Sequence, residues 1–222
     1  MLNEINYQKQ KLSLVFILLV LLLEGPVRVM LQPDPWLLQP SHWYFDQPSR
    51  LLIELTIVLV TLYALFKYDT QLLRVKKTHL SLILGSSLGS LLLFSFLEFA
   101  QLQESLHSSL STIVFWLATG FLVGMGQELI YRGLLFTSLA EFFSKNISAI
   151  LTTFAFVIAP LHSIRLWDLY SQGELAIVLL LISIYVAASF FFQWLRDKSN
   201  CVMIPGIAHG IGNAITWLAV FA

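Results

Sequence analysis

The chain has 222 residues, 57% of them hydrophobic and 12% charged, and its mean hydropathy is +0.78. This composition is typical of helical proteins that cross a membrane several times. Basic and acidic residues balance, so no nucleic-acid-binding surface is indicated, and the single cysteine, Cys201, excludes a disulfide framework and a cysteine metal cage.

The first apolar run, 12–23, follows two lysines, and after Glu24, Gly25 and Pro26 the segment 27–31 continues it. No small-residue cleavage site comes after it, so we interpret it as an uncleaved membrane span. We expect a kink near Pro26 and an ion pair between Glu24 and Arg28, which are four residues apart. Residues 33–48 are rich in Trp and Pro, which indicates a segment at the membrane–water interface rather than a cofactor-binding loop.

Three further apolar runs follow, at residues 50–66, 80–99 and 113–143. In the run 80–99, Gly85 and Gly89 predict a close contact with another helix. The third of these runs is longer than the roughly 20 residues that one span needs.

Four glycines occur in this long run, at positions 120, 124, 126 and 133. We expect a bend at Gly124 and Gly126. Gly120 and Gly124, four residues apart, predict tight helix packing.

The fifth span is predicted at 147–164, and Arg165 and Asp168 should lie in the loop after it. The sixth and seventh are predicted at 175–195 and 201–221. The sequence therefore predicts an all-α, polytopic transmembrane bundle of about seven spans, folded as a single membrane domain.

The basic segments all fall on the same side of the membrane in this seven-span arrangement. They precede the first span, join the second to the third and the fourth to the fifth, and follow the sixth. Basic loops stay in the cytoplasm, so we expect a cytoplasmic N-terminus and an external C-terminus.

Two charged residues, Glu128 and Arg132, lie within the long apolar run. Their four-residue spacing lets them pair on one face of a helix. Ionisable residues within hydrocarbon need a partner or a water-filled cavity and are functional candidates for that reason. A buried structural pair that fixes the helix register is the alternative.

Polar residues in three spans reach a similar depth. At 1.5 Å per residue from the cytoplasmic ends, Glu128 lies about 20 Å deep, His162 about 22 Å and His209 about 15 Å. Asn213 lies one helical turn beyond His209. We therefore expect a polar cavity near the middle of the membrane.

Three short motifs resemble, in order, those of the CPBP family of intramembrane proteases, which includes the CAAX prenyl endopeptidases and the bacterial Abi-type proteins. The family patterns are Glu-Glu-x-x-x-Arg, Phe-x-x-x-His and His-x-x-x-Asn. The matching segments are Gln127-Glu128-Leu129-Ile130-Tyr131-Arg132, Ile158-Ala159-Pro160-Leu161-His162 and His209-Gly210-Ile211-Gly212-Asn213. The resemblance covers residues 110–217, the expected catalytic core of a single membrane domain, 1–222.

Two positions depart from the family patterns. Ile158 replaces the Phe, which is a change in packing. Gln127 replaces the first Glu, which in the family is the general base that activates water. An amide does not take up a proton at neutral pH, so Gln127 keeps the size of Glu and loses its chemistry. Gln127 is either an engineered substitution or a natural divergence.

The resemblance implies an endopeptidase that cleaves a membrane-associated peptide or protein. The implied catalytic set is Gln127, Glu128, His162, His209 and Asn213. A Glu at position 127 and His162 would polarise the water, whereas His209 and Asn213 would stabilise the oxyanion. Glu128 would pair with Arg132, or take over as the base. We expect no cofactor, and a zinc ion held by Glu128, His162 and His209 is the alternative.

Two other classes of function stay open. Without its base, the fold could serve as a membrane peptide-binding or scaffold protein. A small transporter is the other alternative, although no inverted repeat is evident. The expected partners are membrane lipid and a peptide or protein substrate, with no nucleic acid. The expected location is a bacterial inner membrane, crossed several times.

Overall fold

The computed structural model describes residues 2–28 and 48–222, apart from the side chains of 2–7 and 27. The regular elements in these residues are all helical, without a strand, which confirms the predicted all-α class. The chain falls into two compact units. Unit 1 comprises Met1–His42 and Ile130–Gln193, and unit 2 comprises Trp43–Leu129 and Trp194–Ala222. The prediction of a single membrane domain is not tested by this division.

Within the described residues, five helices are long and apolar enough to cross a membrane, and a bent pair makes a sixth candidate. The predicted first span, 12–31, ends among residues that the structure does not describe, as does the predicted interfacial segment 33–48. The five helices are Pro48–Tyr68, Lys77–Leu97, Leu110–Leu139, Leu175–Ser199 and Met203–Phe221.

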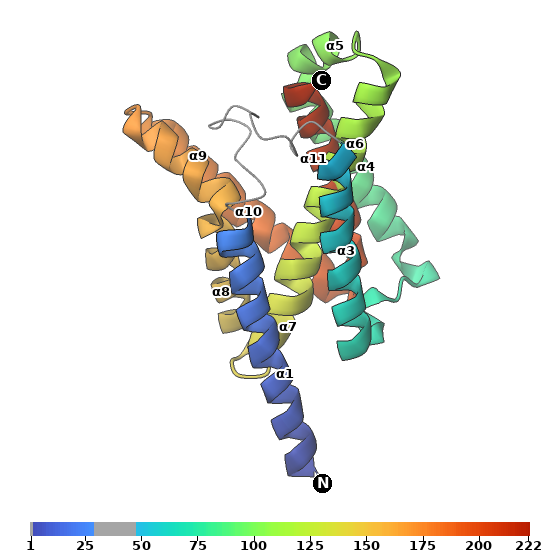
Figure 1. Ribbon diagram of the computed structural model, residues 1–222, viewed down its shortest axis with the longest axis vertical. Helices are drawn as coiled ribbons and strands as arrows, with labels where there is room; N and C mark the ends of the chain where they lie inside the picture. The colour runs from blue at the N-terminus through green and yellow to red at the C-terminus, as the bar shows by residue number, and fades with distance from the viewer. Residues whose placement is uncertain (1, 29–47) are drawn as a thin grey trace. The chain divides into compact units, whose positions relative to one another are not determined.

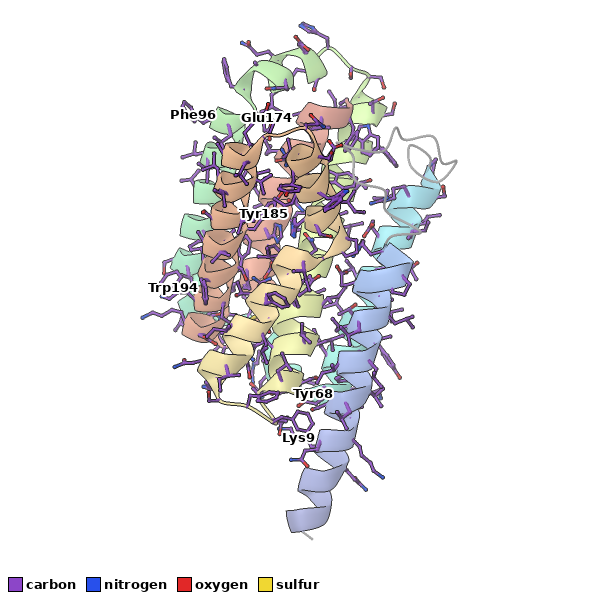
Figure 2. The ribbon with its side chains drawn as sticks, turned by 90° about the vertical axis from the view of Figure 1, so that its left-hand side faces the viewer. Lys9, Tyr68, Phe96, Glu174, Tyr185 and Trp194 are labelled. Carbon is purple, nitrogen blue, oxygen red and sulfur yellow. The ribbon has the colours of Figure 1, made fainter. Side chains whose placement is uncertain are left out.

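Unit 1 begins with helix α1 (Leu2–Leu22), which packs against the short helix α7 (Phe136–Leu139). Lys9 lies beside the connection that follows α7 (Figure 2), and its ammonium is 2.6 Å from the Glu141 carboxylate. The remaining helices of this unit are α8 (Lys145–Ile158), α9 (Pro160–Ser171) and most of α10 (Leu175–Ser199).

The predicted kink near Pro26 is confirmed. A π-helical turn, η1 (Leu23–Val27), follows α1, and Gly25 within it has the non-helical angles φ −97° and ψ −106°. Proline lacks the N–H that would continue the α-helical ladder. The predicted ion pair also forms, because Arg28 Nη2 donates to Glu24 Oε1 at 2.8 Å.

The predicted span 147–164 is not one straight helix. It is broken into α8 and α9, whose axes differ by 57°. Ala159 has ψ 145° because the ring of the following Pro160 disfavours the helical region for the residue before it. Arg165 and Asp168 therefore lie within helix α9, and their assignment to a loop was wrong.

Unit 2 is built around helix α11 (Met203–Phe221), which packs along α6 (Leu110–Glu128), as Figure 1 shows. Trp116, Val123 and Trp217 form the apolar core between these two helices. The other elements are α3 (Pro48–Tyr68), the 3-10 turns η2 (Thr70–Leu73) and η3 (Lys77–His79), α4 (Leu80–Leu97) and α5 (Phe99–Ser105).

The helix α6 stays regular through Gly124 and Gly126, so the bend expected there was wrong. The departure from α geometry comes one turn later, in the π-helical segment η4 (Leu129–Leu135). The contact expected at Gly85 and Gly89 was also wrong, because no described atom of another helix lies within 4 Å of a Cβ built at either glycine.

Candidate active site

The first and third motifs meet in unit 2, where the end of α6 faces α11. His209 Nδ1 lies 2.8 Å from Glu128 Oε1, and both side chains are buried, at 8% and 0% exposure. A carboxylate oxygen accepts hydrogen bonds, so the ring nitrogen is the donor when Glu128 is ionised. Two residues that are 81 positions apart in the chain are thus joined by a direct, buried polar contact.

Glycines make this contact possible by letting the two backbones approach. A Cβ at Gly124 would lie 2.7 Å from the carbonyl oxygen of His209, and one at Gly120 would lie 2.6 Å from the carbonyl oxygen of Asn213. Any side chain at these two positions would push α11 away from α6. The tight packing predicted for Gly120 and Gly124 is therefore confirmed.

Gly206, one turn before His209 on α11, is the third glycine at the contact between the two helices. A Cβ there would lie 2.8 Å from Met125 Sδ and 3.9 Å from Glu128 Cβ. The absence of a side chain at Gly206 therefore leaves room for Met125, three residues before Glu128 on α6. Asn213 lies one turn after His209 on α11 and is half-buried.

Gln127, near the end of α6, is buried. Its side chain is 1% exposed, and among the described residues neither its amide oxygen nor its amide nitrogen has a hydrogen-bond partner. Leaving a buried polar group unpaired typically costs about 1–3 kcal/mol. Buried groups without a protein partner are often those that serve a bound molecule or a catalytic step.

His162, from the second motif, lies in unit 1 on the first turn of α9. It is 8% exposed, and its Nδ1 lies 2.7 Å from the carbonyl oxygen of Phe156. The imidazole packs against the rings of Phe156 and Tyr185, with centroids 4.5 Å and 4.2 Å away. A hydrogen bond to the backbone and contacts with two aromatic rings therefore help to hold the imidazole.

Arg132 belongs to unit 1, where it bonds to α10. Its Nη2 donates to the carbonyl oxygen of Ser189 at 3.0 Å and to the Ser189 hydroxyl at 2.6 Å. The Ser189 hydroxyl is also 2.8 Å from the Thr153 hydroxyl on α8, and the guanidinium lies 4.8 Å from the Phe156 ring centroid. The predicted Glu128–Arg132 pair would join the two units and stays a prediction.

Sequence reasoning missed the roles of Ser189, Thr153 and Tyr131. Tyr131 lies inside the first motif, and its hydroxyl donates to Glu24 Oε2 at 3.0 Å. Small hydroxyl residues are frequent in apolar spans, so Ser189 and Thr153 carried little signal. If Arg28 binds one carboxylate oxygen of Glu24, the other oxygen can accept a further hydrogen bond. The sequence does not indicate which residue donates it.

The zinc alternative requires three protein ligands. Glu128 and His209 provide two within unit 2, and no other described His, Cys, Asp or Glu side chain of this unit completes a cluster of three with them. The third ligand of that alternative, His162, belongs to unit 1. A metal site at these three residues stays a prediction.

Comparison with known proteins agrees with the motifs. Residues 109–215 match the family model described as type II CAAX prenyl endopeptidase Rce1-like. No curated protein and no solved structure matches the chain. The matched segment begins at Ser109, the N-cap of α6, and includes all three motifs. Residues 109–215 are thus similar to the Rce1-like family of CAAX prenyl endopeptidases, and this match together with the apolar helices indicates a multi-pass integral membrane protein.

Proposed function

We propose that the chain is an intramembrane endopeptidase that hydrolyses a peptide bond of a membrane-associated peptide or protein. The observation that carries the proposal is the buried hydrogen bond between Glu128 and His209, which joins the first motif to the third. A carboxylate that orients an imidazole in a buried site is a recurring arrangement in hydrolases.

Hydrolysis of a peptide bond needs an activated water, donors for the oxyanion and a proton for the leaving amine. We assign the polarisation of water to residue 127 together with His162. Both belong to motifs of the matched segment. General-base assistance of this kind is typically worth about 10²–10⁴-fold in rate.

We assign the oxyanion to His209 and Asn213, which lie one turn apart on α11. In this arrangement Nδ1 of His209 donates to Glu128. To donate to the oxyanion as well, Nε2 must also carry a proton, so the ring is then an imidazolium cation. The Glu128 carboxylate is the counter-charge of that cation. Loss of one oxyanion donor typically lowers kcat about 10²–10³-fold.

Gln127 limits what this chain does by that mechanism. Its amide cannot accept the proton of the attacking water, so we propose that peptidase activity is impaired. Glu128 is the alternative base, although its contact with His209 already engages one carboxylate oxygen. The buried, unpartnered amide of Gln127 equally suits a second function, in which the protein binds a membrane peptide without cleaving it.

A cleavage assay separates the two functions. Purified chain and its Gln127→Glu variant are incubated with prenylated and unprenylated peptides, and the products are identified by mass spectrometry. Cleavage by Gln127→Glu that is lost on His209→Ala supports the endopeptidase. Peptide binding by both proteins without any product supports the binding protein.

The proposed orientation places the N-terminus and the segment around Arg74 on the cytoplasmic side of a bacterial inner membrane. It follows from the asymmetry of the basic loops. Cysteines introduced beside Arg74 and beside Glu104 test it in intact cells, in a Cys201→Ser background. An impermeant reagent should label only the site near Glu104, and labelling near Arg74 would reverse the orientation.

A further inference from the structure

The break between α8 and α9 removes the usual partner of one carbonyl group. In an α-helix the carbonyl of residue 156 accepts from the N–H of residue 160. Residue 160 is proline and has no N–H. The Ala159 N–H lies within bonding range of the Phe156 oxygen, but the distance of 3.4 Å is long.

His162 supplies the missing donor. Its Nδ1 approaches the Phe156 oxygen to 2.7 Å, closer than the Ala159 nitrogen does. A carbonyl oxygen only accepts hydrogen bonds, so Nδ1 must carry the proton in this contact. In a neutral imidazole one nitrogen donates and the other accepts, so the acceptor nitrogen is then Nε2.

We propose that Pro160 is a positioning residue for His162: by leaving the Phe156 carbonyl without its helical donor, it fixes the neutral imidazole in the form protonated at Nδ1 and leaves Nε2 as the proton acceptor. The inference rests on the proposed function, because polarising a water molecule requires a ring nitrogen that accepts a hydrogen bond from it. The geometry itself lies wholly within unit 1.

The two motif histidines differ in what their Nδ1 contacts. For His209 the partner is the carboxylate of Glu128, whereas for His162 it is the neutral carbonyl of Phe156. A carboxylate is the counter-charge of a doubly protonated ring, and a carbonyl carries no such charge. The contacts thus suit His209 to donation from Nε2 and His162 to acceptance at Nε2.

Packing supports the same reading. Phe156 is 2% exposed, and its ring and that of Tyr185 lie against the imidazole. Figure 2 labels Tyr185 on α10. Rotation of the ring by a half-turn, which would exchange its two nitrogens, is opposed by these contacts and by the loss of the bond to the Phe156 oxygen.

Nitrogen-15 spectroscopy of the imidazole rings tests the proposal without any need for activity. The full chain is labelled at histidine, in detergent or bilayers at mildly alkaline pH, and the His162 signals are assigned with His162→Gln. Protonated and unprotonated ring nitrogens are well separated in such spectra. We expect His162 to be protonated at Nδ1, and protonation at Nε2 in the unaltered chain would overturn the proposal.

Two proline variants test the cause. Pro160→Ala restores an N–H that competes for the Phe156 oxygen, so a population protonated at Nε2 should appear. Pro205→Ala is the matched control, since residue 205 lies in the first turn of α11, where an N–H has no helical partner, and it should leave the His162 signals unchanged. An unchanged tautomer in folded Pro160→Ala would remove the role of the proline.

The measurement on the unaltered chain needs no substitution, so it decides the matter even if Pro160→Ala does not fold. It also separates this inference from the proposed function. The predicted tautomer together with a silent Gln127→Glu variant would contradict the endopeptidase alone. The opposite tautomer together with an active variant would contradict the role of Pro160 alone.

Discussion

Replacing Gly124 by alanine perturbs the α6–α11 contact at the level of the candidate site. The new Cβ would lie 2.7 Å from the His209 carbonyl oxygen, so the helices must separate by about 0.7 Å to reach an ordinary contact of 3.4 Å. The atoms it meets belong to backbone and cannot rotate away. A separation of this size would stretch the 2.8 Å bond between Glu128 and His209 to the limit of a hydrogen bond.

The expected magnitude follows from two opposing effects. Overpacking of a tight contact typically costs about 1–3 kcal/mol, and a rigid backbone neighbour places Gly124→Ala at the upper end. Alanine regains about 0.5–1 kcal/mol over glycine within a helix. We therefore expect the free energy of unfolding to fall by roughly 2 kcal/mol.

Gly126→Ala is the matched control on the same helix. Its Cβ would meet only Val58 Cγ2, at 3.5 Å, so it should be neutral or stabilising by up to about 1 kcal/mol. Unfolding of both variants in detergent, followed by circular dichroism, measures the difference. Equal stability of the two variants would refute the close approach of α6 and α11.

Further predictions concern the hydrogen bonds of Arg132 and Tyr131 and the reactivity of Cys201. Arg132→Ala should lower the free energy of unfolding by about 3–5 kcal/mol and Ser189→Ala by about 1–3, measured in the same assay, because both remove buried hydrogen bonds at a charged group. Wild-type stability in Arg132→Ala would contradict that network. Tyr131→Phe should lower the free energy of unfolding by about 1–3 kcal/mol, because it removes the hydrogen bond from the Tyr131 hydroxyl to Glu24. The effect should be smaller in a Glu24→Gln background if that hydrogen bond is responsible. Burial raises the pKa of the Cys201 thiol, so maleimide labelling should be slow near neutral pH and accelerate as rising pH forms the thiolate; fast labelling at neutral pH would contradict this.

The sequence predicted most helices because long apolar runs are a strong signal. The predicted span 50–66 lies within α3, Pro48–Tyr68, and 175–195 lies within α10, Leu175–Ser199. The break at Pro160 was missed because the apolar pattern continues across it. A hydropathy pattern records where residues are buried in lipid and not where backbone hydrogen bonds fail.

The site was predicted in part for a related reason. The motif spacing indicates on which face of its helix His209 lies, and the small residues Gly120 and Gly124 indicate close helix packing. A contact between α6 and α11 could therefore have been predicted. The contact of Glu128 with His209 could not have been, because i to i+4 spacing points to Arg132 and carries no information about a residue 81 positions away. The π-helical segment that follows Glu128 also alters the spacing that this reasoning assumed.

The central claim is that the chain is an endopeptidase whose base is missing at position 127. The rate of single-turnover cleavage of one prenylated peptide, compared between the unaltered chain and Gln127→Glu, tests it most directly. We predict a rate at least about 10²-fold higher for Gln127→Glu, because general-base assistance is typically worth 10²–10⁴-fold. Equal cleavage by both proteins would contradict the claim and move the base to Glu128 or to a metal ion.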